Sequence, residues 1–113
     1  MRFSEINAFL ALLLVISTGS AYASNTGPGL VGDINATSNY DYYFKADRTR
    51  TTLPACVTNT RWDIASSTTQ GQAQFALVLS AKLSGRRVVV EGPGTCPAGG
   101  DSETINNLKL VEP

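Results

Sequence analysis

An uninterrupted apolar run near the amino terminus sets the strongest limit on the fold, because it indicates that part of this chain is removed before the rest folds. Nine apolar residues, Ala8–Ile16, follow the basic Arg2 and lead to Ala21-Tyr22-Ala23, the small-x-small pattern that signal peptidase reads. The run is shorter than the roughly 20 residues needed to cross a bilayer. We therefore predict a signal peptide over residues 1–23, whose removal from 113 residues leaves 90. The alternatives are an uncleaved N-terminal anchor and a buried core helix.

The composition excludes several classes of function. The chain has 9 basic residues, 9 acidic residues and no His. A neutral chain has no overall field to hold a polyanion, so we do not expect nucleic acid as a partner. The absence of His removes the commonest general base and the commonest neutral metal ligand, and we expect no metal and no cofactor. No second long apolar run follows, so we expect a secreted or periplasmic protein with no membrane span after signal removal.

Two cysteines, Cys56 and Cys96, lie in the part that remains. An exported chain meets an oxidising compartment, where an even pair of cysteines indicates a disulfide. In the chain-entropy model, a cross-link over this span stabilises the fold by about 4 kcal/mol. That contribution matters because a chain of this size buries little surface.

The segment after the predicted cleavage point, residues 24–29, is polar and contains Gly and Pro, and we expect it to be a flexible lead-in. The rest, residues 30–113, is predicted to be a single domain with five strand-like segments of alternating or β-branched composition. These segments are Leu30–Ala36, Tyr40–Ala46, Cys56–Ile64, Arg86–Glu91 and Thr104–Val111.

One segment, residues 72–84, is rich in the helix formers Ala and Leu. Thr69-Gln70-Gly71-Gln72 has the spacing of a capping box, and Gly85 stands where a left-handed residue ends a helix. A stripe at helical spacing predicts the face that packs on the core. The stripe consists of Ala73, Phe75, Ala76, Leu79 and Leu83.

The order of these elements is strand, strand, strand, helix, strand, strand. It predicts a mainly β protein with one helix (α+β), most simply a five-stranded Greek-key OB-like barrel whose helix plugs one end. The alternative is an open α+β sandwich built from the same elements.

Four stretches carry a resemblance to a known family: RWDIASS at 61–67, QAQFALVLSAKLSG at 72–85, RRVVVEGPGTC at 86–96 and SETINNLKL at 102–110. Together with the predicted fold, they resemble the small secreted bacterial OB-fold proteins that include the B subunit of subtilase cytotoxin. The resemblance covers roughly residues 30–113 and implies a sugar-binding subunit of an AB5-type toxin that forms a homo-oligomeric ring. The chain has only two Cys and no sugar-binding motif that matches residue by residue, so no binding residues are carried over.

The residues themselves offer two groups of candidate ligand-binding side chains. Aromatic faces pack on the apolar C–H faces of sugars, and Tyr43 is the best surface candidate. We expect the other large aromatic residues of these strands to pack in the core; they are Tyr40, Tyr42, Phe44 and Trp62. The second group, Arg48, Arg50 and Arg61, suits an anionic sugar or a carboxylate, because Arg binds such groups bidentately. The alternative for these arginines is ordinary solvated surface.

We therefore expect a non-catalytic binding module whose partner is a cell-surface glycan. The alternative is a protein-interaction or inhibitor protein that uses the same surface. An enzyme is not expected, because glycoside hydrolysis needs two carboxyls roughly 5–10 Å apart and nothing in the spacing brings two of the acids together. The acids considered are Asp33, Asp63, Asp101 and Glu103.

Overall fold

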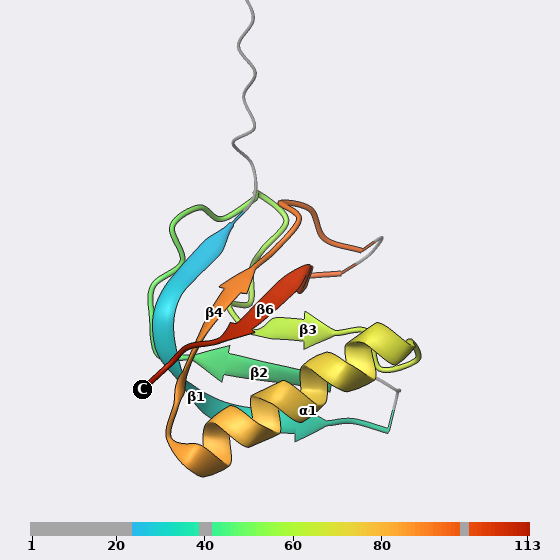
Figure 1. Cartoon of the computed structure of the whole chain (residues 1–113). Coiled ribbons are helices and arrows are strands. Elements are labelled where there is room, and N and C mark those ends of the chain that lie inside the picture. Colours follow the sequence, from blue (N-terminus) through green and yellow to red (C-terminus); the bar gives the residue numbers. More distant parts are fainter. Residues whose placement is uncertain (1–23, 39–41, 98–99) are drawn as a thin grey trace, which may run out of the picture.

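A computed structural model describes residues 24–38, 42–97 and 100–113 (Figure 1). The predicted signal peptide and Tyr40 lie outside these residues. No helix in the described ranges has both the length and the apolar character needed to span a membrane. The described elements are β1 (Asn25–Ala36), β2 (Tyr42–Ala46), β3 (Trp62–Ile64), α1 (Thr69–Ser84), β4 (Arg87–Glu91), β5 (Glu103–Thr104) and β6 (Asn107–Leu110).

All described strands belong to one curled, half-barrel sheet with the order β5-β3-β2-β1-β4-β6. The long strand β1 is central: its first half pairs with β4 and its second half with β2, both antiparallel. The register shifts in both pairings, between Thr26 and Gly29 and between Val31 and Ile34. Such irregularities bend a strand and increase its twist, which explains the strong curl of the sheet in Figure 1.

The two edge strands are consecutive in the chain. β5 pairs in parallel with β3, whereas β6 pairs antiparallel with β4. The chain changes partner at Ile105, whose N–H donates to the Asp63 carbonyl, and Asn106, whose N–H donates to the Glu91 carbonyl. The prediction of one strand over Thr104–Val111 was therefore wrong, and the described sheet has six strands rather than five.

The lead-in prediction was also wrong, because residues 25–29 belong to β1. Backbone pairing with β4 holds this segment, and such pairing does not require apolar side chains. The predicted strand over Cys56–Ile64 is confirmed only for Trp62–Ile64. The chain before it is irregular because the N–H groups of Thr58 and Asn59 both donate to the Asp101 carbonyl instead of to a neighbouring strand.

The predicted helix is confirmed, and so is its end at Gly85, which has a φ of 68°. Its start differs by one residue from the capping-box prediction. Thr68, not Thr69, is the N-cap, and its hydroxyl accepts a hydrogen bond from the Gly71 N–H at 2.9 Å. The helix contacts β1, β3, β4 and β6.

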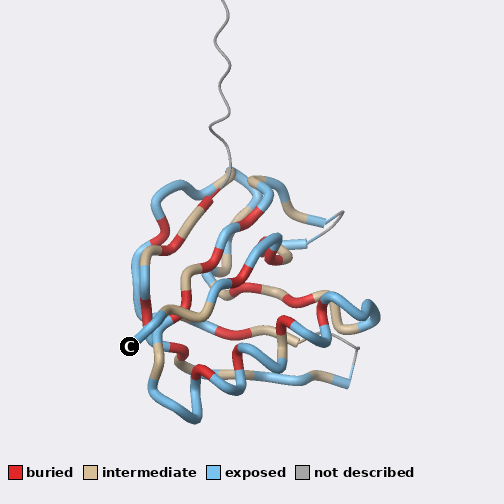
Figure 2. The backbone as a smooth tube through the Cα atoms, viewed as in Figure 1, coloured by how far each residue is buried: buried red, intermediate tan, exposed pale blue. Residues whose placement is uncertain are grey.

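The face of α1 that packs on the sheet is not the predicted stripe. Its buried residues are Gly71, Gln74, Val78 and Ala81. Leu79 and Leu83 are 39% and 87% exposed, and only Phe75 of the stripe packs against the core. Apolar residues occur on all sides of this helix, so their periodicity did not determine which side faces the sheet. Figure 2 shows buried positions alternating with exposed ones along the helix.

The core lies between the helix and the sheet, and both contribute apolar side chains to it. Trp62 and Phe44 are its largest members, as predicted, while Tyr42 packs against its margin. The other buried apolar residues are Val31, Ile64, Val78, Ala81, Val88, Val90, Ile105 and Leu108. The predicted disulfide is present: Cys56 in the loop before β3 is bonded to Cys96 in the loop after β4.

We predict that replacing both Cys56 and Cys96 with Ser lowers the free energy of unfolding by about 2–5 kcal/mol, because the unfolded chain gains conformational freedom. Urea denaturation followed by circular dichroism measures this change. Wild-type protein kept reduced serves as the control and should show the same loss. An unchanged unfolding midpoint in the double variant would contradict the prediction.

Candidate functional site

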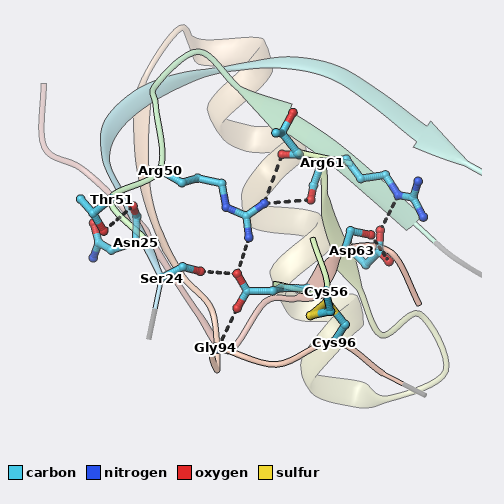
Figure 3. Close-up of polar contacts among 12 residues, drawn as sticks. Ser24, Asn25, Arg50, Thr51, Cys56, Arg61, Asp63, Gly94 and Cys96 are labelled. Atoms are coloured by element: carbon cyan, nitrogen blue, oxygen red, sulfur yellow. Dashed lines mark hydrogen bonds and ion pairs between the residues drawn. A yellow bond between two sulfur atoms is a disulfide. The ribbon is translucent and has the colours of Figure 1, made fainter. Parts of the chain in front are cut away.

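A buried ion pair joins four separate parts of the chain. Glu103, at the start of β5, is fully buried and forms a salt bridge with Arg50 from the loop after β2. The same carboxylate accepts hydrogen bonds from the Ser24 hydroxyl and, at 2.8 Å, from the Gly94 N–H (Figure 3). A carboxylate removed from water needs such partners, because burying a charge without them is very costly.

Arg50 is held by further contacts that keep it inside the protein. Its Nη1 donates to the carbonyls of Thr60 and Arg61 at 3.3 and 3.4 Å, and its guanidinium lies 3.6 Å from the centre of the Trp62 ring. Burial lowers the pKa of the Arg50 guanidinium, and the hydrogen bond and charge of Glu103 oppose that shift. The prediction that Arg50 belongs to a surface patch was therefore wrong, since only 8% of the residue is exposed.

We predict that Glu103→Gln lowers the free energy of unfolding by about 3–5 kcal/mol, because Arg50 would remain buried without a compensating charge. Ser24→Ala removes one donor to the carboxylate and should cost about 1–3 kcal/mol. Chemical denaturation at neutral pH measures both. The matched control is Asp101→Asn, which breaks an exposed ion pair worth at most about 1 kcal/mol. Losses of equal size in Glu103→Gln and Asp101→Asn would refute the structural role of Glu103.

Gly92 has a special position beside this cluster. A Cβ at Gly92 would lie 2.4 Å from Glu103 Oε1 and 2.8 Å from Trp62 Cζ3, closer than real contacts allow. A Cβ at Gly27, by contrast, would meet no atom within 4 Å. The absence of a side chain at Gly92 thus lets the backbone approach the ion pair.

We predict that Gly92→Ala destabilises the protein by about 1–3 kcal/mol, because the added methyl group forces the Glu103 and Trp62 side chains to move. Gly27→Ala should leave stability unchanged or raise it slightly by restricting the unfolded chain. Thermal unfolding of the two variants measures the difference. Equal melting temperatures would show that the close approach at Gly92 carries no cost.

One surface pocket among the described residues, here called the Tyr43 pocket, has a volume of about 210 Å³. It lies over β1, β2 and the segment before β3. Its lining residues are Asp33, Asn35, Tyr43, Lys45, Asn59 and Arg61. Most of these side chains are polar, so the pocket offers both hydrogen-bond donors and acceptors.

Arg61 is the best-fixed side chain of the Tyr43 pocket. Its Nε donates to Asp63 Oδ1 at 2.7 Å, and its Nη2 lies 3.1 Å from Asp101 Oδ1. Its guanidinium carbon is 4.7 Å from the centre of the Tyr43 ring, within the range of a cation–π contact. The hydrogen bond to Asp63 raises the pKa of Arg61, while partial desolvation opposes that shift. The Arg61 guanidinium thus contacts both the Tyr43 ring and the carboxylates of Asp63 and Asp101.

A neighbouring pocket, here called the Arg48 pocket, has a volume of about 360 Å³. It is formed by the end of β2, the loop that follows and the start of β3. Its lining residues are Lys45, Ala46, Asp47, Arg48, Thr49, Arg50, Leu53, Thr60 and Trp62. Lys45 lines both pockets.

The four predicted ligand-binding residues are therefore divided between two places. Tyr43 and Arg61 come together in the Tyr43 pocket, whereas Arg48 and Arg50 line the Arg48 pocket. Arg48 is exposed, and its Nε donates to the Pro28 carbonyl at 3.0 Å.

Sequence reasoning missed several polar residues of the Tyr43 pocket. Asp33 and Asn35 alternate on β1, and Lys45 follows Tyr43 by two positions on β2, so strand periodicity places each pair on one face. The signal was present, but only the pairing of β1 with β2 brings the two faces together. The structure also joins Asp63 and Asp101 through Arg61, which no spacing in the sequence indicates.

No known protein family, no curated protein and no solved structure matches the chain. Within the described ranges, no three His, Cys, Asp or Glu side chains form a group suited to hold a metal ion.

Proposed function

We propose that this protein is an exported, non-catalytic binding module that recognises a glycan in the Tyr43 pocket. The observation that supports this proposal is the grouping of Tyr43, fixed by Arg61, with three short polar side chains in one surface pocket. Recognition would be shallow and reversible, with no covalent step.

The chemistry of the lining suits a sugar. Sugars present neighbouring hydroxyl groups, which both donate and accept hydrogen bonds. Asp33 offers acceptors, and Asn35 offers a donor and an acceptor. Asn59 Oδ1 already accepts from the Arg61 N–H at 3.1 Å, which orients its amide NH₂ as a donor. The Tyr43 ring adds an aromatic surface for the C–H groups of the sugar.

The strand pairings support the further proposal of an OB-like barrel. β1, β2 and β3 form a meander, α1 connects β3 to β4, and the segment containing β5 and β6 pairs with both β3 and β4. Counted as one bent strand, that segment would close a five-stranded Greek-key barrel. OB-folds bind oligosaccharides on the face of their second and third strands, and Tyr43 lies on the second while Arg61 directly precedes the third.

The signal-peptide pattern and the disulfide support the proposed location outside the cytoplasm. A Cys56–Cys96 bond is compatible with an oxidising compartment, such as the periplasm or the extracellular space. The toxin-like role and the ring assembly rest on the family resemblance and are part of the same proposal.

A glycan array probed with the disulfide-bonded chain from Ser24 onward tests the proposal. We expect binding to a defined set of glycans, with at least about a tenfold loss of affinity in Tyr43→Ala and Asn35→Ala, since each removes contacts to the sugar. Arg87→Ala, on the exposed side of β4 and outside both pockets, is the matched control. Folded protein that binds no glycan would contradict the proposal and favour the protein-interaction alternative.

A further inference from the structure

The Arg48 pocket differs in chemistry from the Tyr43 pocket. We propose that it is a second binding site, which takes a small organic acid with a flat, apolar body. This proposal does not depend on glycan binding, because it rests on different residues and on a different kind of surface.

The cations of the Arg48 pocket supply a site for a carboxylate. Among the described residues, neither Lys45 nor Arg48 has a carboxylate within salt-bridge distance, although both line the pocket. The bond from Arg48 Nε to the Pro28 carbonyl holds one edge of the guanidinium, and no described residue forms a hydrogen bond or ion pair with its two terminal nitrogens. A guanidinium presented in this way suits a bidentate contact with a carboxylate.

The negative charge at the pocket is already engaged. Asp47 Oδ1 accepts a hydrogen bond from the Leu30 N–H at 2.7 Å, which holds that side chain against β1. The charge of Arg50 is balanced by the buried Glu103 behind it. Lys45 and Arg48 therefore carry two positive charges and Asp47 carries one negative charge, so the lining of the pocket has a net positive charge.

Of the five uncharged lining residues, Thr49 and Thr60 are polar, and the three apolar ones set the body of the ligand. Ala46 and Leu53 line the pocket, and Leu53 is 49% exposed despite its size. Trp62 also contributes, although its ring is almost entirely covered and Arg50 lies over it. A sugar in this pocket would place hydroxyl groups against these apolar side chains. Inorganic phosphate would leave the apolar side chains uncovered. Neither ligand suits this pocket as well as an acid with an apolar body.

The volume limits the size of the ligand. At about 360 Å³ the pocket lies near the lower end of the range for small-molecule sites, roughly 300–1,000 Å³. One aromatic ring with a short carboxylate arm fits this space, with the carboxylate at Arg48 and the ring against Leu53.

Trp62 is the only tryptophan of the chain, so it reports directly on this pocket. The disulfide-bonded chain from Ser24 onward is titrated with 3-phenylpropanoate while Trp62 fluorescence and the indole N–H resonance are recorded. We expect a saturable change. The matched ligands 3-phenylpropanamide, which lacks the charge, and acetate, which lacks the apolar body, should each bind at least about tenfold more weakly. Equal affinity for the acid and the amide, or no response to the acid, would overturn the proposal.

Variants locate the response. Arg48→Met and Leu53→Ser should each weaken binding of 3-phenylpropanoate by about tenfold, since they remove the carboxylate partner and the apolar wall. Arg87→Met, a matched charge removal outside both pockets, and Tyr43→Ala should leave the affinity unchanged. If Tyr43→Ala lost the response while Arg48→Met kept it, the acid would bind in the Tyr43 pocket, and the proposal would be overturned. All four positions are at least partly exposed, and thermal unfolding verifies that each variant is folded.

Discussion

The carboxylate of Glu103 must be satisfied inside the protein, and much of the surrounding chain is arranged to do so. Its partners come from the first residue of the described structure, from the loop after β2 and from the loop after β4. A buried ion pair adds little net stability relative to apolar packing, but loss of one partner is severe because the other is left uncompensated. The pair therefore specifies where these loops lie more than it adds to the total stability.

Both surface pockets depend on this arrangement. The loop after β2 that carries Arg50 also carries Arg48 and Leu53, so the ion pair fixes one wall of the Arg48 pocket. Arg50 Nη1 also donates to the carbonyl of Arg61, which places that backbone beside β2 and Tyr43. The buried ion pair of Arg50 and Glu103 thus positions residues that face solvent. Binding sites need this kind of support, because their side chains must be held in a fixed geometry.

The two pockets are adjacent but have different chemistry. Short polar side chains and a fixed aromatic ring make the Tyr43 pocket suitable for a molecule rich in hydroxyl groups. Cations beside an apolar wall make the Arg48 pocket suitable for a charged molecule with an apolar body. Lys45 lines both pockets, so they share one cation.

Local features of the sequence were sufficient to predict the type of most elements. These features are strand alternation, the helix formers before Gly85 and the even pair of cysteines. The first two depend only on neighbours in the chain, and the third depends on the expected oxidising compartment. The structure confirms the helix, the disulfide and the buried Trp62. Tertiary structure decided the rest: which side of α1 is buried, the inclusion of residues 25–29 in β1, the burial of Arg50, and the meeting of Tyr43 with Arg61. These outcomes depend on how distant segments satisfy one another's backbone and charges, and periodicity carries no information about such pairings.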